Sequence, residues 1–216
     1  MNENPKVTAS EQLPDQQATT DRSFWVDLII AGFLVALCVA LRLFLVQWPN
    51  LSPVAGFALL GGLTLRHRSL ALGIPLVSML ITDQVLGGYD WIVMAAVYGC
   101  LTAPVVIGWI GRSRLPRQGW SRHIAATGFG LAAGLVASLC FFFVTNLAFW
   151  YCFEMGRTSL AQCYIDALPF FRYTLLGDLI FCGSLTTGWS FANRFAVAMQ
   201  QRKSIVATQD ADLTSV

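Results

Sequence analysis

The stretch Pro49–Gly88, PNLSPVAGFALLGGLTLRHRSLALGIPLVSMLITDQVLGG, decides how the rest of this sequence is interpreted. It holds two apolar segments separated by the basic turn Arg66–Arg68, and one acid, Asp83, inside the second of them. A carboxylate inside an apolar membrane-length helix is costly, so it marks a functional or structural site. The fold must therefore account for what Asp83 faces.

The composition of the 216-residue chain is that of a membrane protein. Hydrophobic residues make up 56% of it and charged residues 12%, against about a quarter charged in soluble domains. The net charge of +2 is small, and the basic residues are spread over short loops, so nucleic acid is excluded as a partner. The expected partner is the lipid bilayer, and the expected location is the inner cell membrane, crossed several times.

The apolar runs predict an all-α bundle of six transmembrane segments within residues 23–199. A full span needs about 20 apolar residues, and the second run, which contains the Gly61-Gly62 pair, is shorter. That segment is expected to be either re-entrant or packed inside the bundle. The predicted segments are 25–48, 52–65, 70–86, 91–110, 124–150 and 170–195.

Three parts of the chain are expected to lie outside these segments. Residues 1–22 and 200–216 are polar and are predicted to be disordered tails. The loop 152–169 is predicted to contain a short helix capped by Ser159. A disulfide between Cys152 and Cys163 stays open, because it depends on the loop facing an oxidising compartment.

The distribution of Lys and Arg predicts that both termini are cytoplasmic. Cytoplasmic loops carry an excess of these residues, and with the N-terminus inside, only Arg42, Arg157 and Arg172 fall in the outer half. Treating the short second segment as a non-spanning loop would place the basic loop after residue 110 on the opposite side from the N-terminus. Six segments therefore fit the charge pattern better.

Several polar side chains are predicted to converge in the outer half of the membrane. Depth along each helix, at about 1.5 Å per residue, places them at one level. They are interpreted as the binding site of a small polar solute, in a pocket open to the outside. The residues are Arg42, Asp83, Asp178 and Arg172, with Asn146, Trp150, Trp48 and Asn50 completing the site.

The same charges have an alternative interpretation as a structural lock. Buried charges are paired whether or not they bind a ligand, and Arg42 could pair with Asp83 or with Asp178. The protein would then have a structural or assembly role. Four charges on three helices are more than one lock needs, which favours the pocket.

An enzyme or a metal protein is not predicted. Both histidines, His67 and His123, follow or precede arginines and are interpreted as solvated loop residues, so no metal site and no general base are expected. The run Leu175–Asp178, LLGD, lacks the first glycine of the GxGD motif of aspartyl intramembrane proteases. No cofactor is expected either.

Small residues recur at four-residue spacing in the first segment. Gly32, Ala36 and Ala40 form a small-xxx-small ridge that lets another helix approach closely. Packing against a sister helix of the same chain is the simpler interpretation, and contact with a partner helix is the alternative.

The Pro49–Gly88 stretch, followed by a fourth segment ending in VIGWIGR, resembles the substrate-binding S components of energy-coupling factor vitamin transporters at the level of fold. The chain more closely resembles an uncharacterised bacterial membrane-protein family in which FFFVTNLAFW and CYIDALPFFRYTLLGDLIF recur. The resemblance implies a small-molecule pocket open to the outside. It also implies a transmembrane coupling subunit, associated with ATPases, that contacts the ridge at Ala36 and Ala40. The turn Arg66–Arg68 and the long loop 152–169 depart from the S-component pattern.

Overall fold

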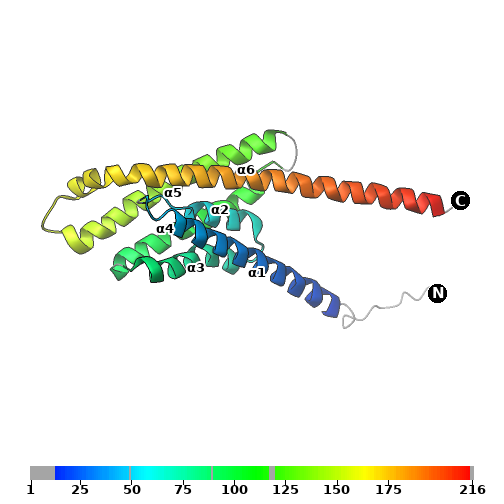
Figure 1. The fold of residues 1–216 in the computed structure, drawn as a ribbon, viewed down its shortest axis with the longest axis horizontal. Helices are drawn as coiled ribbons and strands as arrows, with labels where there is room; N and C mark the ends of the chain where they lie inside the picture. The colour runs from blue at the N-terminus through cyan, green and yellow to red at the C-terminus, as the bar shows by residue number, and fades with distance from the viewer. Residues whose placement is uncertain (1–12, 49, 89, 117–119, 215–216) are drawn as a thin grey trace, which may run out of the picture.

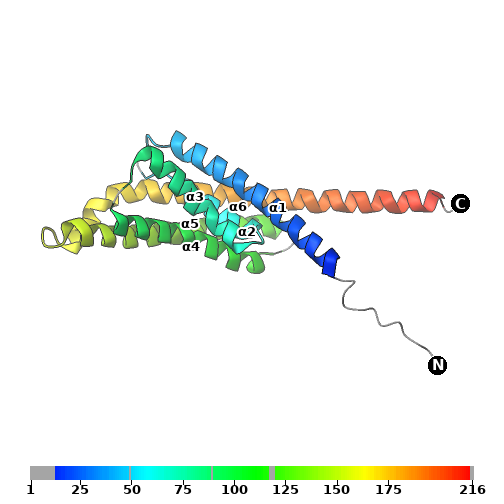
Figure 2. The same ribbon diagram turned by 90° about the horizontal axis from the view of Figure 1, so that it is seen from below.

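The computed structural model describes residues 13–48, 50–88, 90–116 and 120–214, and this part of the chain is helical throughout its regular structure. It forms six α-helices and one π-helical turn: α1 (Leu13–Phe44), α2 (Val54–Thr64), α3 (Arg68–Leu86), α4 (Trp91–Arg114), α5 (Trp120–Phe149), η1 (Trp150–Glu154) and α6 (Leu160–Thr214). The N-terminal end of α1 and the C-terminal end of α6 project from the same end of the bundle (Figures 1 and 2).

Four of the helical segments have the length and composition of membrane spans. They are Phe24–Phe44, Arg68–Leu86, Trp91–Arg114 and Ser121–Glu154. Many of their large apolar side chains face outward: Ile29 is 70% exposed, Trp91 74% and Ile124 72%. Such surfaces suit lipid rather than water, as expected for a membrane protein.

Helix α2 forms the centre of the bundle. It contacts all five other α-helices, and nine of its residues are buried, because it is apolar on every side, as a fully enclosed helix must be. Its 11 residues extend only about 16 Å. Of the two predicted alternatives for this short segment, packing inside the bundle is therefore confirmed.

Glycines allow α2 and α4 to touch through their backbones. A Cβ on Gly62 would collide with the carbonyl oxygen of Val105, and one on Gly108 would lie 2.6 Å from the carbonyl oxygen of Leu59. Only a residue without a side chain fits at such contacts. The Gly61-Gly62 pair of the sequence is thus explained by packing.

A second close approach joins α5 to α6. Ala126, Gly130 and Gly134 lie four residues apart and are all buried. A Cβ on Gly134 would lie 2.6 Å from the backbone oxygen of Asp178. The stripe therefore fixes the depth of Asp178 relative to α5.

The boundaries of α1 and α6 differ from the predicted ones. α1 begins at Leu13 and α6 continues to Thr214, so both helices enter regions expected to be disordered tails; residues 1–12 and 215–216 lie outside the described part. Ser159 caps α6 as predicted, since its Oγ accepts a hydrogen bond from the Gln162 N–H at 3.1 Å. The capped helix is not short, however, because it runs through Pro169 without a break.

The cysteines of the 152–169 loop are not joined. Cys152 and Cys163 are both free thiols. Cys163 Sγ instead lies 3.8 Å from the backbone oxygen of Asn146. The disulfide that the sequence left open is therefore not formed in this structure.

Candidate functional site

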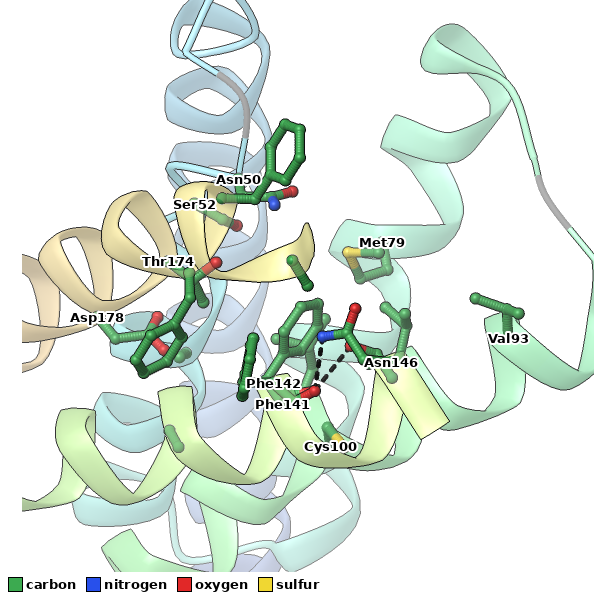
Figure 3. A pocket seen from close by; sticks show the side chains of 18 of the residues that line it. Asn50, Ser52, Met79, Val93, Cys100, Phe141, Phe142, Asn146, Thr174 and Asp178 are labelled. Carbon is green, nitrogen blue, oxygen red and sulfur yellow. Dashed lines mark hydrogen bonds between the residues drawn. The ribbon is translucent and has the colours of Figure 1, made fainter. Parts of the chain in front are cut away.

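A cavity of about 460 Å³ lies among the helices, above the N-terminal end of α2. All six α-helices contribute to its wall, and Ser52 and Ala55 bring the start of α2 to it. Figure 3 shows Thr174 and Asp178 on one side and Met79 and Val93 on the other. The cavity exists because α2 is too short to fill the bundle along its whole length.

The wall is mainly apolar, with a few polar groups. Phe141, Phe142 and Phe171 supply aromatic rings, and Thr145 and Asn146 supply polar atoms. The Asn146 Nδ2 donates to the Phe142 backbone oxygen at 2.7 Å, which leaves the amide oxygen of Asn146 available as an acceptor. An apolar lining with a small number of polar groups is typical of sites for small organic molecules.

Arg42 lies at the cavity edge and is held by α3 and by the segment just before α2. Its Nε donates to Thr82 Oγ1 at 2.9 Å, its Nη1 donates to Ser52 Oγ at 3.2 Å, and its Nη2 lies 3.6 Å from Asp83 Oδ1. Asp83 also accepts a hydrogen bond from the Tyr98 hydroxyl at 2.9 Å. This Arg42–Asp83 cluster joins α1, the start of α2, α3 and α4.

Asp178 stands apart from that cluster. It is 6% exposed and lines the cavity from α6. Within the described part of the chain, no hydrogen bond or ion pair reaches its carboxylate. The two aspartates that the sequence placed in one group therefore have different environments: Asp83 is paired and Asp178 is not.

The eight residues predicted for the solute site are only partly brought together. Arg42, Asn50, Asn146 and Asp178 line the cavity, and Asn50 adopts a left-handed conformation with φ 63°. Asp83 contacts the site through Arg42 rather than lining it.

The remaining three lie away from the cavity wall. Arg172 is exposed and stacks its guanidinium on Tyr173, 4.7 Å from the ring centroid. Trp150 lies in η1, where its Nε1 donates to the backbone oxygen of Thr158 at 3.0 Å. Trp48 is 46% exposed.

The small-residue ridge of α1 faces outward. Gly32, Ala36 and Ala40 are all exposed, and nothing lies within 4 Å of a Cβ built on Gly32. The ridge does not pack against a sister helix in the described chain, so that interpretation is wrong for this structure. Contact with a partner helix stays a prediction.

Two clusters at the opposite end of the bundle were not found by sequence reasoning. Asp27 Oδ2 accepts hydrogen bonds from the backbone N–H groups of Arg66 and His67 at 2.8 and 3.0 Å, and lies 2.8 Å from His67 Nδ1. Arg112 donates to the last carbonyls of α2, those of Leu63, Thr64 and Leu65, at 2.9 to 3.1 Å. The sequence did contain an indication of the first cluster, because Asp27 is an acid that lies only two residues after Trp25, inside the first apolar segment.

Of the two histidines predicted to be solvated loop residues, His67 is a partly exposed loop residue and His123 is buried in a helix. His123 lies in α5 and is 4% exposed; it stacks on Phe191 and its Nδ1 lies 2.8 Å from Ser190 Oγ. His67 immediately precedes α3 and contacts Asp27. The prediction is therefore wrong for His123, whose ring packs between α5 and α6.

Replacing Asp27 by Ala is expected to lower the free energy of unfolding by about 1 to 3 kcal/mol, since two backbone N–H groups at the start of α3 lose their acceptor. Asp27→Asn keeps an acceptor oxygen and should cost less. Thermal unfolding of the protein in detergent micelles measures both. Equal losses in the two variants would contradict the assigned role.

Comparison with known proteins places the chain in a family. The model of DUF6580, a family of unknown function, matches residues 22–201. No curated protein matches the chain. No solved structure matches it either, so the comparisons give no support to the resemblance to energy-coupling factor S components. The matched region runs from within α1 to within α6 and includes every residue that lines the cavity, and the chain belongs to the DUF6580 family of unknown function.

Proposed function

We propose that this protein is a membrane-embedded binding component for a small polar organic solute, which enters from the side opposite the two termini. The observation that carries the proposal is the cavity of about 460 Å³ at that end of the bundle, a size within the usual range for small-molecule sites. Its wall is built from all six α-helices, so a bound solute would contact the whole bundle.

The proposed topology has six membrane segments with cytoplasmic termini. The common direction of the ends of α1 and α6 (Figures 1 and 2) supports it. The excess of arginines in the loops and helix ends on the same side, including Arg66 and Arg112, supports it as well. In this orientation the cavity lies in the outer half of the inner membrane. We propose binding rather than catalysis, because among the described lining residues no Ser, Thr or Cys is hydrogen-bonded to a carboxylate or a histidine.

Uptake of the solute would require a partner that supplies energy. The exposed ridge Gly32, Ala36 and Ala40 offers a surface on which a transmembrane coupling subunit could pack closely. This part of the proposal rests on the resemblance to S components and on the outward direction of the ridge.

The alternative role, a structural or assembly protein, draws support from the Arg42–Asp83 cluster. Its hydrogen bonds join four elements and stabilise their packing. The cluster does not include Asp178, however, and a lock does not explain an open space beside it. Solute binding accounts for both features.

Filling the cavity tests the proposal. The full chain in lipid nanodiscs is equilibrated with a defined mixture of amino acids, nucleosides, amines and organic acids, and retained compounds are identified by mass spectrometry. Ala137 is buried and lines the cavity, so Ala137→Trp is expected to abolish retention of a compound that the unmodified protein binds saturably.

The matched control is Ala132→Trp, on the outward face of the same helix, which should retain the compound. Thermal unfolding establishes that both variants fold. The proposal fails if the unmodified protein retains nothing, or if Ala137→Trp retains as much as Ala132→Trp.

A further inference from the structure

We propose that the solute carries a cationic group, such as a protonated amine, which pairs with the carboxylate of Asp178. This inference rests on the proposed function, because it names the chemical class of solute for the same cavity. The observation behind it is that Asp178 is buried and has no hydrogen bond or ion pair among the described residues.

The three buried aspartates of the described chain differ in how their charge is compensated. Asp27 accepts hydrogen bonds from backbone N–H groups and lies against His67. Asp83 faces Arg42 and accepts from Tyr98. Asp178 has no such contact in the described residues although it is 6% exposed. Since an unpaired buried charge is strongly unfavourable, a cation from outside the chain is the missing partner.

The positive groups that face the cavity do not replace that partner. Arg42 reaches the same cavity, but its guanidinium is engaged with Asp83, Thr82 and Ser52. The N-terminal end of α2 also faces the cavity and contributes about half a unit of positive charge. The carboxylate of Asp178, when ionised, is therefore only partly compensated, and the cavity is then net negative.

Aromatic rings on the neighbouring wall suit the same ligand. Phe142 and Phe171 lie with ring centroids 4.7 Å apart, and Phe141 lines the same space. The faces of aromatic rings attract organic cations. A wall of phenylalanines beside one carboxylate thus accommodates the apolar and the charged parts of such a molecule.

The approach to the cavity is acidic. A second hollow of about 360 Å³ shares Asn146, Phe149, Ala167 and Phe170 with the first, so the two adjoin. Its lining adds Glu154 and Asp166, and no basic residue lines it among the described residues. A cleft lined by charges of one sign concentrates ligands of the opposite sign, so this adjoining hollow favours cations near the cavity.

Probes of matched size and different charge test the inference. The full chain in nanodiscs of uncharged phosphatidylcholine is titrated with 2-phenylethylammonium, 2-phenylethanol and phenylacetate, and then with choline and its uncharged isostere 3,3-dimethyl-1-butanol. Each cation is expected to bind about 10- to 100-fold more tightly than its uncharged counterpart. For 2-phenylethylammonium the gain comes from a charge-assisted hydrogen bond, and for choline, whose ammonium has no N–H, it comes from ion pairing and contact with the aromatic rings. Phenylacetate should bind most weakly.

The variant Asp178→Asn should lose this preference and leave the affinity for the alcohols unchanged. It is expected to fold, because it removes an unpaired buried charge, and thermal unfolding checks this. The control Thr174→Val removes a polar group one turn away on the same cavity wall and should keep the preference for cations.

Equal affinity for all charges, tighter binding of phenylacetate, or a preference that survives in Asp178→Asn would each overturn the inference. If no probe binds, the compound retained in the cavity-filling experiment decides: a cationic compound supports the inference and an uncharged or anionic one overturns it. If nothing is retained there either, the proposed function itself fails, and the inference with it.

Discussion

Replacement of Arg42 by Met should lower the free energy of unfolding by about 3 kcal/mol, because it leaves the carboxylate of Asp83 buried without its cation. The Asp83 side chain is only 6% exposed and the Arg42 side chain 20%. The same replacement removes the donors to Thr82 and Ser52, so α3 and the segment just before α2 both lose contacts with α1. Reversible unfolding in mixed micelles measures the loss.

Two variants separate the ion pair from a general effect of removing an arginine. Arg172 is exposed, so Arg172→Met should change the free energy by no more than about 0.5 kcal/mol. The double variant Arg42→Met with Asp83→Leu leaves no unpaired charge, and its cost should be clearly less than the sum of the single costs. Additive single costs, or equal effects of Arg42→Met and Arg172→Met, would contradict the ion-pair assignment.

Replacement of Gly62 by Ala is expected to destabilise the fold by about 2 to 3 kcal/mol, because the added methyl group collides with the backbone of Val105 on α4. Backbone atoms cannot rotate away as a side chain can, so α2 and α4 must separate. Since α2 contacts every other α-helix, the separation would disturb the whole bundle. Gly62→Leu should prevent folding.

The matched control for this prediction is a glycine on α4 itself. Gly99 is exposed and nothing lies within 4 Å of a Cβ built on it, so Gly99→Ala should be neutral or stabilise the helix by up to about 1 kcal/mol. Thermal unfolding of the two variants in the same detergent compares them. A Gly62→Ala protein as stable as Gly99→Ala would show that α2 and α4 do not approach as closely as described.

Helix boundaries could be predicted from the sequence where a glycine or a capping residue stands at the end of a helix. α3 ends at Leu86 and α4 begins at Trp91, as predicted, because glycines after Leu86 end one helix and Asp90 caps the next, accepting from the Ile92 N–H at 2.9 Å. The start of α6 could not be predicted in this way. Pro169 indicated a boundary, but the helix begins at Leu160 and absorbs the proline.

The depth of a residue along its helix predicted only part of the arrangement of polar residues at the site. Estimates of depth placed Arg42, Asp83 and Asp178 at one level, and the structure brings all three close to one cavity. Depth does not say which face of a helix a side chain occupies. Rotation about the helix axis, set by packing, turns Arg172 outward and Asp178 inward, although both lie on α6.

The lengths of the apolar runs, with the glycines and prolines between them along the chain, were enough to predict an all-helical protein with apolar segments of membrane-spanning length. Only the tertiary structure decided which charges pair. Partner choice depends on distances between helices, and those distances are set by backbone contacts at Gly62, Gly108 and Gly134. The contacts of Gly62 and Gly108 hold the short α2 against α4, and the contact of Gly134 holds α6 against α5. The packing of α1 on α3 pairs Arg42 with Asp83, whereas Asp178 lines the cavity with no hydrogen bond or ion pair among the described residues.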